Sequence, residues 1–125
     1  LFCLEMGAHR ITESAPGLNS SFDAYSTQTN SRIQVKACSV LPDLTSFGPK
    51  SVWDRLFFCD FYRQGNWDGT FDIYEIPNHF IYNHNVSSTM TFVQQQQAKR
   101  RPRFSIYKDI IQVQNIKPVK TGRAF

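Results

Sequence analysis

The sequence has no long apolar run and few cysteines, and both shortages exclude whole classes of protein. No stretch of 18 apolar residues occurs, so the sequence predicts no membrane-spanning helix. A charged N-terminal segment followed by an apolar run, the pattern of a signal peptide, is also missing. The cysteines are Cys3, Cys38 and Cys59, and their odd number and wide spacing fit neither a disulfide framework nor a zinc knuckle. We therefore expect free thiols in a reducing cytoplasm.

Internal repeats and domain boundaries are also lacking. The length of 125 residues is that of a single domain, and a chain of this length can bury a core without disulfide bonds. Hydrophobic residues make up 41% of the sequence and aromatic residues 14%, which is typical of a globular protein rather than a disordered tail. The sequence starts at Leu1, within a helical pattern, so we expect a single domain over residues 1–125 whose N-terminal part is truncated.

Charge is distributed unevenly along the chain. Residues 1–98 carry six Lys/Arg against nine Asp/Glu, a net charge of −3. Residues 99–125 carry eight Lys/Arg against one Asp, a net charge of +7. A mildly acidic body with a basic C-terminal quarter fits a protein that binds a polyanion. It fits a solvated basic tail equally well, and charge alone leaves the two open.

Hydrophobic periodicity predicts an α/β domain with a mixed central sheet of about four or five strands, flanked by helices. Strands are expected over residues 9–13, 22–26, 32–40, 56–62, 71–76 and 103–107. Helical structure is expected at residues 1–7, 51–55 and 77–82, and residues 91–99 fit either helix or loop. The polar residues 27–31 would join the second and third strands into a β-hairpin. Beyond residue 107 we expect an irregular end.

One constellation of side chains on this hairpin carries chemistry. The strand over residues 32–40 is predicted to be half-buried, with an inward face formed by Ile33, Val35 and Ala37. Gln34 and Lys36, two residues apart, then project from the other face. Asp23 on the neighbouring strand can reach that same face. A carboxylate, an amide oxygen and an ammonium would therefore converge at the sheet edge.

Such a set suits phosphodiester hydrolysis. Mg²⁺ prefers oxygen ligands and usually takes only one or two protein carboxylates. The metal polarises a phosphoryl oxygen and acidifies a bound water, and a lysine can orient that water and offset transition-state charge. The pattern is short, however, and an alternating strand with an ordinary surface lysine is the alternative.

Longer stretches of sequence carry a family resemblance. Residues 22–25 (FDAY) and 32–40 (RIQVKACSV) resemble the PD-(D/E)xK nucleases. Three further segments are more specific, namely residues 43–49 (DLTSFGP), 66–74 (NWDGTFDIY) and 100–106 (RRPRFSI). Together they resemble the small group of type II restriction endonucleases that cut GCNGC, and the likeness runs from about Asp23 to Gly122.

This resemblance implies a restriction-endonuclease-like PD-(D/E)xK core, Mg²⁺ dependence and a homodimer that cuts a symmetric double-stranded DNA site. By position, Asp23 matches the metal-binding Asp, Gln34 the Asp/Glu position and Lys36 the catalytic lysine. Glu5, on the preceding helix, is a weaker match to an additional glutamate. The sequence departs from the pattern at Phe22, where the family has proline, and at Gln34, which adds no charge and should lower metal affinity.

Further residues are candidates for DNA contact. A basic cluster follows the glutamine run and is formed by Lys99, Arg100, Arg101 and Arg103. Arginine pairs with guanine and glutamine with adenine, so Gln97 joins this set, while phosphate contact needs only the charge. Ser39, just beyond Lys36, is a candidate for contact with the scissile phosphate. The alternative for the basic cluster is a solvated face.

Other polar and aromatic residues are expected to have structural roles. The three histidines, His9, His79 and His84, lack metal-ligand spacing. Asp60 and Asp72 are expected to be satisfied structural carboxylates rather than metal ligands. Trp53 and Trp67 are expected to pack within the protein rather than stack on bases.

Rival functions stay open from the sequence. One is a nucleic-acid-binding module without catalysis, which would bind but never cut. Another is a structural or interaction domain, in which Lys36 lies on an ordinary strand. A third is a homing or repair nuclease of the same superfamily, whose cleavage products on defined duplexes would differ.

Overall fold

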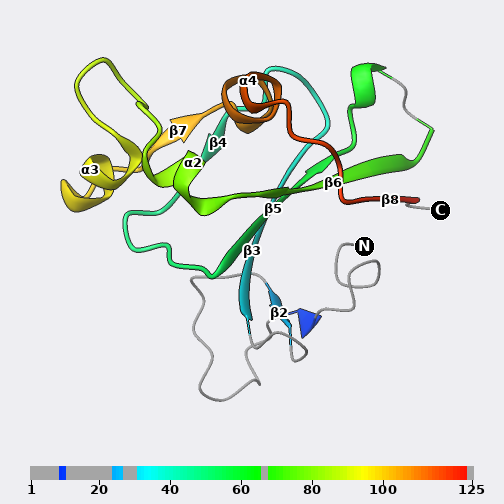
Figure 1. Ribbon diagram of the computed structural model, residues 1–125, viewed down its shortest axis with the longest axis horizontal. Coiled ribbons are helices and arrows are strands. Elements are labelled where there is room, and N and C mark those ends of the chain that lie inside the picture. The colour runs from blue at the N-terminus through cyan, green and yellow to red at the C-terminus, as the bar shows by residue number, and fades with distance from the viewer. Residues whose placement is uncertain (1–8, 11–23, 27–30, 66–67, 124–125) are drawn as a thin grey trace.

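The structure is a computed structural model, and it describes residues 9–10, 24–26, 31–65 and 68–123. A six-stranded sheet in the order β1-β2-β3-β5-β6-β8 forms its centre (Figure 1). Its strands are β1 His9–Arg10, β2 Ala24–Ser26, β3 Ser31–Cys38, β5 Arg55–Asp60, β6 Thr70–Ile76 and β8 Lys120–Arg123. The mixed α/β class expected from the sequence is confirmed.

The main sheet is mixed because only one of its pairings is parallel. β2 and β3 pair antiparallel, with Ala24 opposite Ile33, which confirms the predicted hairpin. β3 and β5 run parallel, and the remaining neighbours are antiparallel. The expected four or five strands were too few, because β8 was missed. Its sequence, KTGR, buries only Gly122 and so has no apolar alternation to detect.

The central strands are buried on both faces, and each face belongs to its own apolar cluster. Phe57 and Cys59 of β5 lie in the smaller cluster, whereas Leu56 and Phe58 lie in the larger one. This arrangement explains why β5 reads as a continuous apolar run.

β3 contributes to both clusters too, so the expectation of a half-buried strand was wrong. Ile33 and Val35 pack in the smaller cluster as predicted, but Ala37 is exposed. On the opposite face, Cys38 belongs to the larger cluster and Lys36 lies against its Phe47. The chain after β3 folds back over this face, so Lys36 is part-buried there.

Short helices and a small second sheet lie on the side of β5 and β6 that faces the larger cluster (Figure 1). The helical elements are α2 Asn78–Tyr82, α3 Phe92–Gln97, η2 Tyr107–Ile111 and α4 Gln112–Gln114, with η1 Arg63–Gly65 after β5. The stretch left open between helix and loop is therefore helical at α3. A capping box starts α3, because the side chain of Thr91 accepts from the Gln94 amide and the Gln94 side chain accepts from the Thr91 amide. In the described part of the chain, no helix has both the length and the apolar character needed to cross a membrane.

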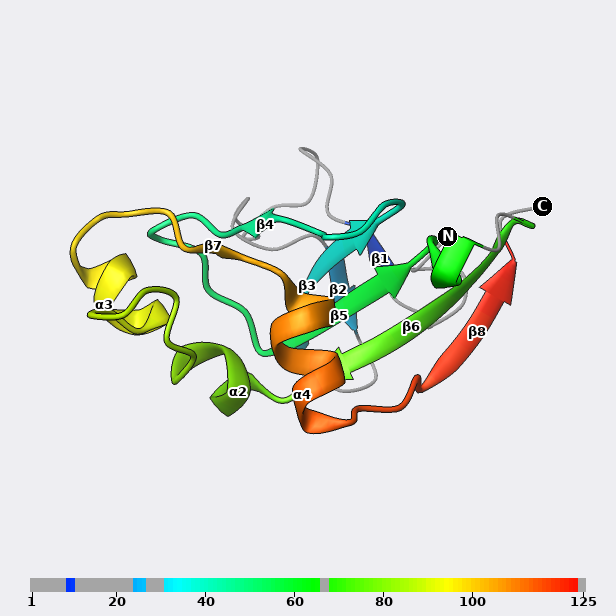
Figure 2. The same cartoon turned by 90° about the horizontal axis from the view of Figure 1, so that it is seen from above.

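The second sheet pairs β4 Thr45–Ser46 with β7 Arg103–Phe104, side by side in Figure 2. We refer to this two-stranded sheet as the ribbon. The predicted strand over residues 103–107 ends at Phe104, because the chain turns into a helical segment at Ile106. The helical turn expected at residues 51–55 was wrong, since residues 51–53 are irregular and β5 starts at Arg55. The expected irregular end was also wrong, because η2, α4 and β8 follow.

Candidate active site

Lys36 is held by the ribbon that crosses its face of the sheet. Its Nζ donates a hydrogen bond of 3.1 Å to the carbonyl oxygen of Ser46 on β4. The same Nζ lies 4.9 Å from the ring centroid of Phe47. The side chain is part-buried.

Gln34 lies two residues before Lys36 on β3, so both side chains leave the strand on the same face. The residue is only 7% exposed, and its side-chain oxygen Oε1 is buried. Two other predicted ligands, Asp23 and Glu5, lie outside the described residues. Asp23 immediately precedes Ala24, whose strand partner, Ile33, is the neighbour of Gln34. The structure therefore describes half of the predicted catalytic and metal set.

The described residues supply one candidate oxygen donor for Mg²⁺, the side chain of Gln34. Among them, no group of three or more His, Cys, Asp and Glu side chains could hold a metal. The amide oxygen of Gln34 is of the donor type that Mg²⁺ takes, because this ion prefers oxygen.

Asp60 and Asp72, opposite each other on β5 and β6, have structural partners. Oδ1 of Asp60, a residue only 3% exposed, accepts from the amides of Tyr62 at 2.9 Å and Arg63 at 3.1 Å. Asp72 accepts from Arg63 Nε at 3.3 Å and from the Thr121 hydroxyl at 2.7 Å. Asp60 and Asp72 thus both hold the turn after β5, and Asp72 also joins β6 to β8 through Thr121, which supports the structural interpretation.

Cys38 and Cys59 are free and buried. Burial and the nearby Asp60 carboxylate raise the pKa of Cys38 to about 12, and burial raises the pKa of Cys59 to about 11. Both therefore stay protonated at neutral pH, where a thiol is a poor nucleophile and metal ligand. The expectation of free thiols is confirmed for these two, and Cys3 lies outside the described residues.

Three of the predicted DNA-contacting cations lie on the connection between α3 and the ribbon, and the fourth, Arg103, lies on β7 itself. All four are exposed, namely Lys99, Arg100, Arg101 and Arg103; we call residues 99–103 the basic segment. The segment is fixed to the chain around β4, because the Phe47 amide donates to the Pro102 carbonyl at 2.9 Å and Ser46 pairs with Arg103. Ser46 is also the residue whose carbonyl binds Lys36. The structure thus joins the lysine to the basic segment through a single residue.

α3 reinforces this connection from the other side. Nε2 of Gln96 lies 3.0 Å from the carbonyl oxygen of Gly48 and 3.3 Å from that of Ser51. The helix is followed by Lys99 with a left-handed φ of 60°, which turns the chain toward the ribbon. The remaining candidates for DNA contact, Gln97 and Ser39, are both exposed.

Trp53 packs in the larger cluster, as expected, with its ring centroid 5.5 Å from that of Tyr82. Trp67 lies outside the described residues. His79 is exposed, in line with the expectation for this residue. His9 lies on β1.

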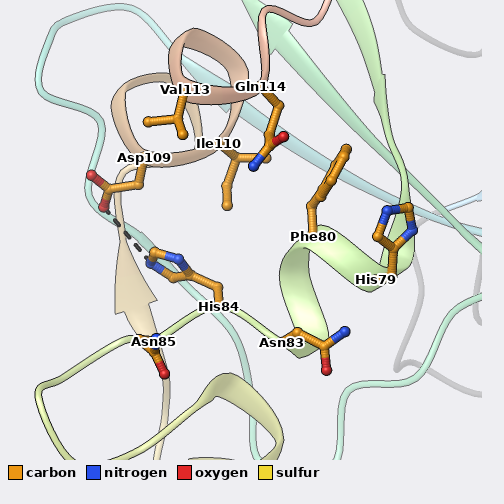
Figure 3. Close-up of a pocket in the computed structure, with 9 residues that line it drawn as sticks. All are labelled: His79, Phe80, Asn83, His84, Asn85, Asp109, Ile110, Val113 and Gln114. Atoms are coloured by element: carbon orange, nitrogen blue, oxygen red, sulfur yellow. Dashed lines mark ion pairs between the residues drawn. The ribbon is translucent and has the colours of Figure 1, made fainter.

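His84 lines a cavity of about 560 Å³ between the α2 region and the η2–α4 segment (Figure 3). Its Nε2 lies 3.9 Å from Oδ2 of Asp109, and the two side chains point toward each other. Burial lowers the pKa of His84 below 6.5, and the Asp109 carboxylate opposes this shift. The ring also contacts Phe104 at a centroid distance of 4.6 Å, so this histidine packs against the core.

Two residues important for the site's geometry were missed by the sequence analysis. Asp43 is 4% exposed and receives hydrogen bonds from Thr45, Ser105, Ile106 and Tyr107. Phe47 is fully buried beneath the Lys36 ammonium. Both belong to the segment quoted for the family resemblance, but no local signal assigns them a role, because the main partners of Asp43 lie more than 60 residues away.

Comparison with known proteins gives the class of this chain and then its family. The model of a protein family described as "Bsp6I restriction endonuclease" matches residues 1–113 of this chain. The chain belongs to this Bsp6I family, which confirms the resemblance to type II restriction endonucleases.

A curated relative is the type II restriction enzyme Bsp6I of Bacillus sp. (strain RFL6), which is 37% identical over 100 residues. The alignment covers 78% of this chain and 56% of that enzyme, so the chain spans about half the length of its relative. No solved structure matches the chain.

Proposed function

We propose that this chain carries the active site of a Mg²⁺-dependent type II restriction endonuclease that hydrolyses double-stranded DNA at GCNGC. One observation carries the proposal beyond family membership. The ribbon connects Lys36 to the basic segment, because Ser46 binds the lysine through its carbonyl and pairs with Arg103. The cation proposed for the chemistry and the cations proposed for the substrate are therefore connected through one residue.

In this proposal Lys36 and Gln34 of β3, together with Asp23 and Glu5, have distinct catalytic roles. Lys36 orients the attacking water and offsets the negative charge that develops on the phosphate. Gln34, Asp23 and Glu5 hold Mg²⁺ through oxygen atoms. When bound, Mg²⁺ supplies a Lewis acid for the phosphoryl oxygen. Burial of Gln34 favours this role, since a ligand in a part-dry site is held in one orientation.

The basic segment binds the DNA backbone and reads bases. Exposed arginines neutralise phosphates wherever they touch the duplex, and one that reaches the major groove can pair bidentately with guanine. Gln97 is the candidate for pairing with adenine, and Ser39 for contact with the scissile phosphate. The exposure of all these side chains supports this assignment.

The fold and assembly follow from the same proposal. The chain would form a PD-(D/E)xK core, in which the strand bearing Gln34 and Lys36 is central, and it would act in the cytoplasm. A symmetric DNA site has two scissile phosphates related by a two-fold axis, so we propose a homodimer with one site per subunit.

Incubation with plasmid DNA, in Mg²⁺ or in EDTA, tests the proposal. We expect discrete fragments in Mg²⁺ only, with ends that all map to GCNGC. Tight binding without cutting in any metal would favour the noncatalytic module instead. Cutting at long or structure-defined sites would favour a homing or repair nuclease.

Sedimentation of the protein on a duplex that contains one GCNGC site tests the assembly. Two chains per duplex are expected. One chain per duplex, with efficient cutting of both strands, would contradict the homodimer and require sequential nicking.

A further inference from the structure

The Phe47 ring beneath Lys36 is fixed by its neighbours. The side chain is fully buried, and its ring centroid lies 5.0 Å from that of Phe92, 5.4 Å from that of Trp53 and 5.8 Å from that of Phe104. Aromatic contacts at these distances add to the free energy of area burial and favour one ring orientation. Phe47 therefore presents to the sheet a π-surface that three aromatic neighbours pack against.

The ammonium of Lys36 is attracted to this surface. Its Nζ lies 4.9 Å from the ring centroid, within the range in which the ring quadrupole binds a cation. The neighbouring carbonyl of Ser46 accepts from the same nitrogen at 3.1 Å. A lysine side chain has a flexible four-carbon stem, and two directional contacts from adjacent residues restrict it to a small volume.

We propose that Phe47 is a positioning residue for Lys36, holding the ammonium where it meets the scissile phosphate. This inference rests on the proposed catalytic role of Lys36. Positioning matters here because misplacement of a catalytic group by about 1 Å can cost 10²-fold in rate. An aliphatic residue of similar size would fill the core but leave the ammonium without its π-surface.

The backbone of Phe47 is also hydrogen-bonded to the segment proposed to bind the substrate. The amide of Phe47 donates to the carbonyl of Pro102 at 2.9 Å, and Pro102 lies within the basic segment. The residue under the lysine is thus hydrogen-bonded directly to the segment proposed to touch DNA, next to the ribbon. A substitution of the ring leaves this backbone hydrogen bond in place. It should therefore lower the cleavage rate of the bound complex and leave the DNA affinity unchanged.

Phe92 supplies a matched control. Both phenylalanines are fully buried, belong to the larger cluster and contact each other edge to face. Phe47→Leu and Phe92→Leu each remove one ring from that cluster, so both should lower the melting temperature by a similar amount. Phe47 alone has the cation above it among the described contacts.

The experiment measures DNA affinity in EDTA, and then the single-turnover rate in Mg²⁺ with protein in excess, at a temperature where all variants are folded by circular dichroism. For Phe47→Leu we expect a rate loss on the order of tenfold, within the range of a cation–π contact, and an unchanged Kd. Phe92→Leu should lose much less, because the Phe47 ring, with its contacts to Trp53 and Phe104, stays beneath the ammonium. Equal rates for the two variants would overturn the inference.

Two further substitutions keep the test decisive if leucine prevents folding. Phe47→Tyr retains the ring and should cut at nearly the wild-type rate, whereas Phe47→Met fills the space without a π-surface and should lose about tenfold. Equal rates for these two would overturn the inference as well.

Lys36→Ala, assayed in parallel, distinguishes failure of the proposed function from failure of the positioning role. Wild-type cleavage by this variant would refute the proposed function. Loss of cleavage by Lys36→Ala together with no effect of the Phe47 variants would refute the positioning role alone.

Discussion

The hydroxyl of Ser105 donates a 2.6 Å hydrogen bond to Oδ1 of Asp43, which lies 62 residues earlier in the chain. The amide of Ile106 donates to the other oxygen of the same carboxylate at 2.8 Å. Asp43 thereby joins the loop after β3 to the first turn of the last helical segment. A negative charge at this position also suits the positive end of a helix. The contact fixes both strands of the ribbon at one end.

We predict that Asp43→Ala destabilises the protein strongly. The substitution leaves the Ser105 hydroxyl and the Ile106 amide buried without their acceptor, which should lower the free energy of unfolding by about 3 kcal/mol. Chemical denaturation measures the loss. Asp54→Ala is the control, since this exposed carboxylate pairs with Arg32 at the surface and should contribute much less. Similar losses in the two variants would contradict the role of Asp43.

Gln34 is predicted to bind metal through its amide oxygen. Gln34→Glu should retain Mg²⁺ binding or strengthen it, because a carboxylate adds charge to an oxygen donor. Gln34→Leu should weaken binding beyond detection. Calorimetric titration with Mg²⁺ or Mn²⁺ measures both variants, and unchanged binding in Gln34→Leu would make Gln34 purely structural.

The basic segment should set the salt dependence of DNA binding. Replacement of Arg100, Arg101 and Arg103 by alanine removes three exposed cations, so affinity should fall and the salt slope should flatten by about one unit per lost phosphate contact. Fluorescence anisotropy over a range of salt concentrations gives this slope. An unchanged slope would place the DNA on another face of the protein.

His84 should make the protein less stable in mild acid. Because burial lowers its pKa in the folded state below 6.5, the unfolded chain binds the proton more readily. Its contribution to stability is therefore fully present above about pH 6.5 and is lost as the pH falls through the lowered pKa. NMR titration should give a pKa below 6.5, and a lower one still in Asp109→Asn, where the opposing charge is gone. A pKa at or above 6.5 in the wild type would contradict this account.

Local sequence patterns were enough to predict the centre of the fold. β5 and β6 have apolar residues at positions that a buried strand requires, and the hairpin of β2 and β3 follows from alternation on either side of a polar turn. Of the ribbon, β7 was anticipated within the strand expected over residues 103–107, whereas β4 has two residues and could not be predicted. The ribbon's stability comes from Asp43 and other partners distant in sequence, which leave no periodic signal.

The candidate site was predictable to a similar degree. The two-residue period of a strand places Gln34 and Lys36 on one face, whatever the rest of the fold. The contacts of the Lys36 ammonium depend on how the chain folds back after β3 to bring Ser46, ten residues later, over the strand. The contacts of Lys36 with Ser46 and Phe47 therefore emerge only in three dimensions.

The account's central claim is that Lys36 and Asp23 carry out DNA cleavage. The most direct measurement is the cleavage of supercoiled plasmid in Mg²⁺ by Asp23→Ala and Lys36→Ala, with folding checked by circular dichroism. Lys36 is part-buried and makes its described contacts through its terminal nitrogen, so its loss should leave the fold intact. We predict folded variants that bind DNA and leave the plasmid uncut. Cutting at the wild-type rate by either folded variant would contradict the assignment of the site.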